Sequence, residues 1–592
     1  MFTKLSDRQK ESKKNFINNY IGSKNAASGS LFDANSNVTT KNIATLEAEL
    51  NKDINIQVNR FLVFNKIKEI FGEDTANNYL RQIENHEIYV HDETSLKPYC
   101  TSISMYPLLL NGLTGLGGES KAPKHLTSFC GSFVNLLFSV SSQFAGAVAT
   151  VEFLLYFDHF ARLDYGDNYL ETHSKVINNE LQHVVYAINQ PAAARGYQSV
   201  FWNISLYDIH YYESMFGEFV FPDMTKPSWT SLNKLQKYFM KWFNKEREKA
   251  VLTFPVITAA MLTKEQKVYD NNFAEFCAEE LSEGNSFFIY QSDSADSLAS
   301  CCRLRNEISD NTFSYSLGAG GVSTGSINVI TINMNRHEQQ NISLDETLDN
   351  IYKYQVAYRK IMDDYINAKM LPVYDAGFIS LNKQFLTIGI NGMVEAAEFN
   401  GIKISDNVEY KEFINNKLKL IYDKNKLAKQ EYGYMFNTEF VPAENLGVKN
   451  SNWDEKDGMV VNRDCYNSYF YIVEDDSINV VDKFFLHGKD YIQYLDGGSA
   501  YHCNLEEYPT KEGFLKLLNT AAYTGCNYFC FNIKVTVCNE CDYINKETKH
   551  SCIKCGSDNV DHATRVIGYL KRIKNFSKDR QIEEKLRNYD KI

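Results

Sequence analysis

The sequence predicts an α/β fold with strands inside and helices around them, followed by a small cysteine-rich segment. Three observations support this prediction. Apolar residues recur at helical spacing in residues 7–90 and in many later segments. These segments alternate with short β-branched runs, such as VLTFPVIT at 251–258 and INVITINMN at 327–335, which is typical of an α/β core. Two CxxC pairs follow residue 531, so we expect two domains, residues 1–530 and residues 531–592.

The composition favours a large globular protein that does not bind nucleic acid. The chain has 592 residues, of which 44% are hydrophobic, and this is enough for a sizeable buried core. Its formal net charge is −12, and no run of Lys and Arg forms a long basic stripe. Nucleic acid is therefore not the expected partner, because phosphate backbones are bound by concentrated positive charge. Small phosphorylated substrates need only a few local donors and are compatible with this charge.

No segment is typical of export or of a membrane span. Residues 3–16, TKLSDRQKESKKNF, contain no apolar core of a signal peptide. The most apolar zone, residues 125–163, is interrupted by polar residues and predicts two helices buried in a large core. The interruptions are Asn135, Gln143, Glu152 and Asp158. The polar segment at 25–42 predicts a loop between the first helices. We expect a soluble cytoplasmic protein whose thirteen cysteines are reduced.

Four cysteines near the C-terminus form two CxxC pairs. Cys538 and Cys541 make one pair, and Cys552 and Cys555 make the other. Such pairs can place four thiolates tetrahedrally around Zn²⁺ and close a structural site. The alternative, four unligated thiols in a charged loop, would leave reactive groups exposed for no gain. The charges between and around the pairs are mixed in sign, so the expected role is to staple the fold rather than to bind nucleic acid.

A glycine follows the cysteines within TRVIGYL, residues 564–570. Gly568 weakens a stretch otherwise suited to a strand, and a bulge or tight turn is one explanation. The other explanation is chemical: a radical on a glycine Cα is shared with the adjacent amide groups, and a side chain would hinder the planar geometry. Such a stored radical would be passed to a cysteine thiyl. The adjacent Cys301 and Cys302 in DSLASCCRLR are candidates for that partner.

These motifs together resemble the anaerobic (class III) ribonucleotide reductases, a glycyl radical enzyme family. The resemblance rests on RVIGYL, the two CxxC pairs before it, CCRLR and GSINVITINMNR at 325–336. Further matches are NAASGSLFDANSNVTT, HDETSLKPYC at 91–100, NQPAAARGYQSVFWNIS at 189–205 and VPAENLG at 441–447. The matches extend over nearly the whole chain in order. RVxGY alone is shared with the pyruvate formate-lyase type, whereas the CxxC pairs indicate the reductase.

The resemblance implies a ten-stranded α/β barrel in which finger loops carry the reacting groups inward. By this match, Gly568 stores the radical and Cys302, directly before an arginine, becomes the thiyl, with Cys301 as the fallback. Cys100 corresponds to a second active-site cysteine on the other side of the substrate. The alternative for Cys100 is a small buried hydrophobic residue.

The mechanism implied is oxygen-sensitive reduction of ribonucleoside triphosphates to deoxyribonucleoside triphosphates, which supplies DNA precursors. The thiyl takes hydrogen from the 3′ carbon of the ribose, and Cys100 provides a proton as the 2′-hydroxyl leaves as water. Formate or a thiol system is the reductant. Many relatives carry an Asn where Ser326 aligns, with Asn328 two places later, so formate is not assigned. Glu444 matches a family carboxylate near the substrate.

The resemblance also implies partners. The chain lacks a CxxxCxxC motif, so a separate activating enzyme with S-adenosylmethionine and an iron–sulfur cluster is expected to make the radical. The start of the chain aligns with the catalytic domain, and we expect no N-terminal ATP-cone. A homodimer regulated by dNTP and ATP effectors is expected from the family. The alternatives are a glycyl radical enzyme of the pyruvate formate-lyase or dehydratase type, and a zinc-ribbon binding protein without chemistry.

Overall fold

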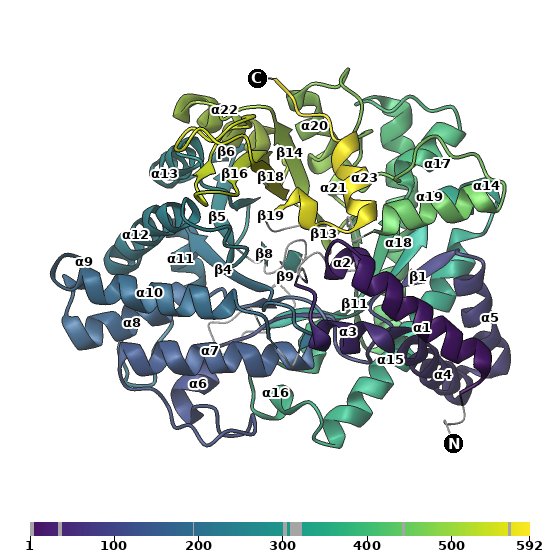
Figure 1. Cartoon of the computed structure of the whole chain (residues 1–592), viewed down its shortest axis with the longest axis horizontal. Helices are drawn as coiled ribbons and strands as arrows, with labels where there is room; N and C mark the ends of the chain where they lie inside the picture. The colour runs from purple at the N-terminus through teal and green to yellow at the C-terminus, as the bar shows by residue number, and fades with distance from the viewer. Residues whose placement is uncertain are drawn as a thin grey trace.

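The computed structural model describes residues 5–32, 38, 40–192, 195–295, 297–299, 305–307, 323–440, 445–565 and 570–591. Helices surround a ring of strands, and the C-terminal segment lies against one part of that ring (Figure 1). The alternation of helical and β-branched segments in the sequence therefore corresponds to an α/β barrel.

Two half-barrels of parallel strands make up the ring. The first half contains β2 (Cys100–Ser102), β3 (Val148–Ala149), β4 (Trp202–Tyr207), β5 (Val256–Lys264) and β7 (Phe288–Ser292). The second contains β10 (Thr324–Asn333), β11 (Gln384–Asn391), β12 (Met435–Phe440), β13 (Gly498–Ser499), β14 (Tyr501–Leu505) and β15 (Tyr528–Ile533). The halves meet in two antiparallel pairs, β2 with β10 and β7 with β15.

The ring closes through a strand that is interrupted once. β13 pairs with β12, and β14 pairs with β15, while Ala500 alone separates β13 from β14. Counted as one strand, they complete a closed barrel of ten strands in the described part of the chain. The prediction of a ten-stranded barrel is confirmed. The remaining short strands are β1 (Ile88–Val90), which pairs with β10, and β6 (Lys267–Val268), which pairs with β5.

A β-hairpin lies between the two half-barrels in the sequence. β8 (Ser297–Ala299) and β9 (Arg305–Glu307) pair antiparallel. Among the described strands, they form a two-stranded sheet of their own. Figure 1 shows this hairpin near the middle of the ring. It is the segment that contains the CCRLR motif in the sequence.

Each barrel strand presents one face to the helices and one to the interior. On β4, Trp202 packs against the rings of Phe133 and Phe153, which belong to surrounding helices. Side chains alternate along a strand, so Asn203 and Ser205 face the interior. Polar residues thus line an interior whose outer wall is a continuous apolar core.

Long helices connect the parallel strands and cover the barrel, as crossovers between parallel strands require. They are α7 (Leu126–Gln143), α8 (Phe153–Tyr165), α10 (Ser174–Ile188), α12 (Trp229–Arg247), α13 (Asn271–Ser282), α15 (Leu344–Asn367), α18 (Val408–Tyr432), α19 (Leu446–Lys456) and α22 (Lys511–Thr524). The two buried helices predicted for residues 125–163 are α7 and α8, which confirms that expectation. Among the described helices, none is long and apolar enough to cross a membrane.

The N-terminal region is helical, as its periodicity predicts. It consists of α1 (Asp7–Gly22), α2 (Ala26–Gly29), α3 (Ile43–Leu50), α4 (Lys52–Phe71) and α5 (Glu73–Glu84). The one-turn helix α2 falls where a loop was expected, because the Asn25 side chain accepts from Ser28 N and caps it. Asn25 Nδ2 also donates to Lys574 O at 3.0 Å, so the N-terminal helices contact the C-terminal segment.

The C-terminal segment forms its own four-stranded sheet. The order is β17 (Ile544–Asn545), β16 (Val535–Cys538), β18 (Val560–Arg565) and β19 (Leu570–Arg572). Five buried residues make its small core: Val535, Val537, Ile544, Ala563 and Leu570. The last barrel strand ends at Ile533 and this sheet begins at Val535; the domain division after residue 530 remains a prediction. Helix α23 (Lys578–Leu586) follows, and Lys483 holds Asp590 at 2.8 Å against the barrel.

Candidate active site and metal centre

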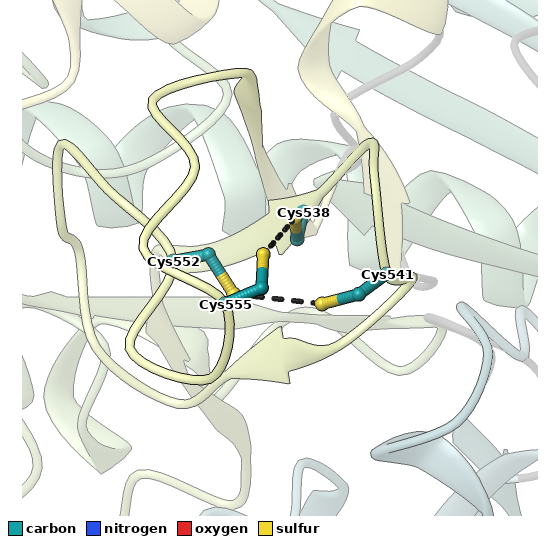
Figure 2. Close-up of side chains that lie close together, drawn as sticks. All are labelled: Cys538, Cys541, Cys552 and Cys555. Carbon is teal, nitrogen blue, oxygen red and sulfur yellow. Dashed lines mark hydrogen bonds between the residues drawn. The ribbon is translucent and has the colours of Figure 1, made fainter.

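The four predicted cysteines converge in the C-terminal sheet. Their sulfur atoms all lie within 4.8 Å of one another (Figure 2). The Sγ atoms of Cys538 and Cys555 are 3.6 Å apart, and those of Cys541 and Cys552 are 3.7 Å apart. A tetrahedral metal with bonds of about 2.3 Å to sulfur requires separations of about 3.8 Å. The cluster therefore has the size that holds one metal ion, and the predicted convergence is confirmed.

Backbone amides donate to two sulfur atoms of the cluster. Glu540 N donates to Cys538 Sγ at 3.3 Å, and Lys554 N donates to Cys552 Sγ at 3.4 Å. The backbone N–H of Cys555, with that of Lys554, lowers the pKa of the Cys552 thiol to about 7. Metal ligands must be deprotonated, and the amides favour that form at Cys552, whereas the neighbouring sulfurs raise the pKa of the Cys541 and Cys555 thiols.

The two strands that flank the glycine motif form a hairpin. Arg565 at the end of β18 pairs with Leu570 at the start of β19, so residues 566–569 connect paired strands. Gly568 lies in that connection and outside the described residues. The end of β18 is bound to the barrel, because Arg565 N and Thr564 Oγ1 both donate to Asn532 Oδ1, at 3.1 and 2.8 Å. Asn532 belongs to the barrel strand β15.

The Arg565 side chain adds a second set of anchors. Its guanidinium stacks 4.9 Å from the Phe288 ring centre of β7 and donates to Ser286 Oγ at 2.8 Å. Arg587, from the segment after α23, donates to Arg565 O at 2.7 Å. Three parts of the fold thus hold the residue at the base of the hairpin tip. Arg565 is thereby fixed at the junction of β7 and β15, where the half-barrels meet.

Cys100 begins β2 and is 4% exposed. Ala147 N lies 3.3 Å from its sulfur and points at it. Gly146 makes room for the thiol, since a Cβ at Gly146 would lie 2.5 Å from Cys100 Sγ. Cys100 belongs to a small cluster with Ala147 that is separate from the main apolar core. Its sulfur is therefore held on the interior side of the barrel wall.

Ser326 lies directly opposite Cys100, and the two are paired residues of β10 and β2. Its hydroxyl is 2.8 Å from Thr387 Oγ1 on β11. A bulge follows, because Ser326 pairs with Phe385 whereas Asn328 pairs with the adjacent Leu386. Neighbouring strand residues face opposite sides, so the bulge turns Asn328 away from the face that Ser326 and Cys100 share.

Comparison with known proteins identifies the family. The family model "Anaerobic ribonucleoside-triphosphate reductase" matches residues 47–589. The chain belongs to that family. It is an oxidoreductase that reduces ribonucleotides, and the pyruvate formate-lyase, dehydratase and non-catalytic alternatives are not favoured.

Solved reductases of this family share the fold. A structure named anaerobic ribonucleotide reductase is 26% identical, with a TM-score of 0.86 over 99% of this chain and 93% of that chain. The anaerobic ribonucleotide reductase from Thermotoga maritima, in complex with dATP and CTP, is 27% identical. Its TM-score is 0.82 over 98% of this chain and 100% of that chain. A comparison with curated proteins gave no match.

Besides Gly568, three site residues expected from the family lie outside the described residues. Cys301 and Cys302 fall between β8 and β9, and Glu444 falls between β12 and α19. The next residue, Asn445, has φ of 64° and accepts from Ser577 Oγ at 2.6 Å. The C-terminal segment of this reductase thus contacts the residue adjacent to Glu444.

Several residues of the barrel interior belong to no sequence motif that would have marked them as functional. Asn532 anchors the hairpin, and Thr387 contacts Ser326. The side-chain amides of Asn203 and Asn437 are buried and have no hydrogen-bond partner within the described residues. Alternation along β4 and β12 was the only available signal, because it places polar residues on the face opposite the apolar ones.

Proposed function

We propose that Gly568 is the radical store of this reductase and that Cys302 is its thiyl residue, with Cys301 as the alternative. The proposal is supported by the anchoring of Arg565 on Asn532 and Phe288, which fixes the base of the hairpin tip at the barrel. It is also supported by the β8–β9 hairpin, which lies between the half-barrels and is drawn near the centre of the ring (Figure 1).

Cys100 is proposed as the proton donor to the departing 2′-hydroxyl. Its position on the interior side of β2, beside Ser326, supports this role. Ser326 and Glu444 are proposed substrate contacts. Asn328 is the weakest of the predicted contacts, because the bulge turns it to the other face of β10. Positioning these groups and excluding water are the contributions expected of the protein.

Zn²⁺ is the proposed occupant of the cysteine cluster. Four thiolates at tetrahedral spacing suit zinc and leave no open coordination position, so the ion would be structural. It would hold β16 against β18, the strand that leads to the glycine hairpin. A separate radical S-adenosylmethionine enzyme is the proposed source of the glycyl radical.

Ribonucleoside triphosphates are the proposed substrates, and dNTPs or ATP the proposed effectors. The complex of the Thermotoga maritima enzyme with dATP and CTP supports this assignment for a chain that aligns over nearly its full length. A homodimer is proposed from the family alone.

The observation that carries the proposal is the hairpin base held by Asn532 at the barrel. The test is anaerobic activation with the activating enzyme, followed by electron paramagnetic resonance and a nucleotide assay. A glycyl doublet together with conversion of CTP to dCTP is expected. A doublet without any nucleotide reduction would contradict the proposed substrate, and activity without a doublet would contradict the radical store.

A further inference from the structure

An arginine clamps the turn that contacts the Cys100 sulfur. Arg195 donates from Nη1 to Gly146 O at 3.1 Å and from Nη2 to Ala145 O at 3.2 Å. The next amide, Ala147 N, is the one that points at Cys100 Sγ. The guanidinium therefore fixes the backbone that sets the orientation of the thiol.

The same arginine brings a positive charge that no carboxylate neutralises at close range. In the described part of the chain, Arg195 has no ion-pair partner and bonds two carbonyl oxygens, and Lys97 has no ion-pair partner either; Lys97 Nζ donates to Ser142 O at 2.9 Å. Burial lowers the pKa of Arg195 to about 10, while Cys100 and Asp92 act in the opposite direction. Arg195 is therefore charged at neutral pH.

Lys97 is affected in the same way as its neighbour. Burial lowers the pKa of its ammonium group, and the Arg195 charge lowers it further. Both side chains are half-buried, so two repelling cations there are unfavourable for folding, and a nearby anion would offset this cost. Asp92 offsets part of this charge, and Cys100, whose sulfur accepts from the turn that Arg195 holds, is the reacting group that interacts electrostatically with Arg195.

We propose that Arg195 is a positioning residue that orients the Cys100 thiol and stabilises the thiolate formed when Cys100 gives up its proton. This inference rests on the proposed role of Cys100. It adds to that role the groups that make proton donation favourable, and it assigns a function to the arginine of the NQPAAARGYQS segment.

The step balances without another reagent. The S–H bond of Cys100 breaks and its proton goes to the 2′ oxygen of the 3′-radical. The C2′–O bond then breaks with its electron pair on oxygen, and water leaves. The 3′-hydroxyl loses its proton as C3′ becomes a carbonyl and the unpaired electron moves to C2′. That proton restores the thiol, so the thiolate beside Arg195 exists only between the two proton transfers.

The test separates this step from hydrogen abstraction. CTP deuterated at C3′ is given to activated wild-type, Arg195→Met, Arg195→Lys and Arg162→Met proteins. Abstracted deuterium exchanges with solvent at the thiol, so its washout from recovered CTP reports abstraction, and dCTP reports the later steps. Arg162→Met is the control, because Arg162 lies on the covering helix α8 and its side chain bonds Asp167, just beyond the end of that helix.

Arg195→Met is expected to keep the glycyl doublet and the washout but to form dCTP at least ~10-fold more slowly, about 1.4 kcal/mol in the barrier. Arg195→Lys should recover part of the rate because it restores the charge. Arg162→Met should match the wild type. Wild-type dCTP formation by Arg195→Met would overturn the inference, and so would loss of washout together with dCTP.

A parallel Cys100→Ala variant distinguishes an error in the proposed role of Cys100 from an error in the inference on Arg195. If Cys100→Ala forms dCTP normally, the proposed role of Cys100 is wrong. If Cys100→Ala fails while Arg195→Met is fully active, only the inference on Arg195 is wrong.

Discussion

Cys100 and Ser326 are paired residues across the antiparallel contact between β2 and β10, one of the two seams that join the half-barrels. Both are buried, and both face the interior. The other seam joins β7 to β15, which carry the Phe288 and Asn532 anchors of the glycine hairpin. The candidate proton donor and the anchors at the base of the glycine hairpin thus lie at different seams of one barrel, with the β8–β9 hairpin between the halves in the sequence.

Replacing Cys100 by alanine should stop deoxynucleotide formation without affecting the radical. The thiol is the proposed proton donor, whereas the anchors of the glycine hairpin lie at the other seam. Turnover should fall by at least ~100-fold, within the range for loss of a general acid, and the doublet should remain. A variant that loses the doublet as well would show that Cys100 acts on activation or folding instead.

Gly146→Ala tests the space beside the sulfur. A methyl group there would lie 2.5 Å from Cys100 Sγ and 3.0 Å from Tyr99 O, so the thiol must shift. We expect a loss of about 1–3 kcal/mol in the free energy of unfolding, typical of overpacking, together with reduced turnover. The matched control is Gly131→Ala in α7, where a Cβ would meet nothing within 4 Å. Chemical denaturation of both variants checks this, and equal stabilities would contradict it.

Cys302→Ala and Cys301→Ala should give different results. Cys302→Ala is expected to abolish turnover while leaving the glycyl doublet, because the thiyl acts after the radical is stored. Cys301→Ala is expected to remain active. Turnover and electron paramagnetic resonance on the same samples are the measurements, and the reversed pattern would assign the thiyl to Cys301.

Removal of the metal should loosen the C-terminal sheet more than the barrel. Its apolar core has five buried residues among those that the structure describes, so the ion is expected to supply much of the sheet's stability. Cys552→Ser should lose about one Zn²⁺ per chain and should be activated poorly. Metal analysis and radical yield test this. Freshly purified wild-type protein without zinc would contradict it.

Patterns in the sequence predicted the helices and the four-cysteine cluster. Periodicity predicted the helices α7 and α8, and spacing predicted the four-cysteine cluster. The closure of the ring could not be predicted from pattern, because β13 has two residues and Ala500 interrupts the strand. Two residues show no alternation, and their pairing depends on contacts distant in the sequence.

The candidate site was predictable only in part for a similar reason. Family motifs indicated Cys100 and Ser326, and the structure brings these two together. The bulge that turns Asn328 away arises from the register with β11, which a single strand does not reveal. Asn532 bonds Arg565, 33 residues away in the sequence, and Arg195 bonds Gly146, 49 residues away. A local sequence pattern does not reveal contacts over such separations.

Oxygen-dependent cleavage at residue 568 tests the central claim most directly. If Gly568 holds the radical, oxygen adds to its Cα and the peptide breaks there, and Gly568→Ala should abolish the doublet, turnover and cleavage together. Mass spectrometry of the activated, air-exposed wild-type protein should show a product that lacks Tyr569–Ile592. Unactivated protein and Gly568→Ala should stay intact. Activated wild-type protein that stays full length in air would contradict the radical role of Gly568.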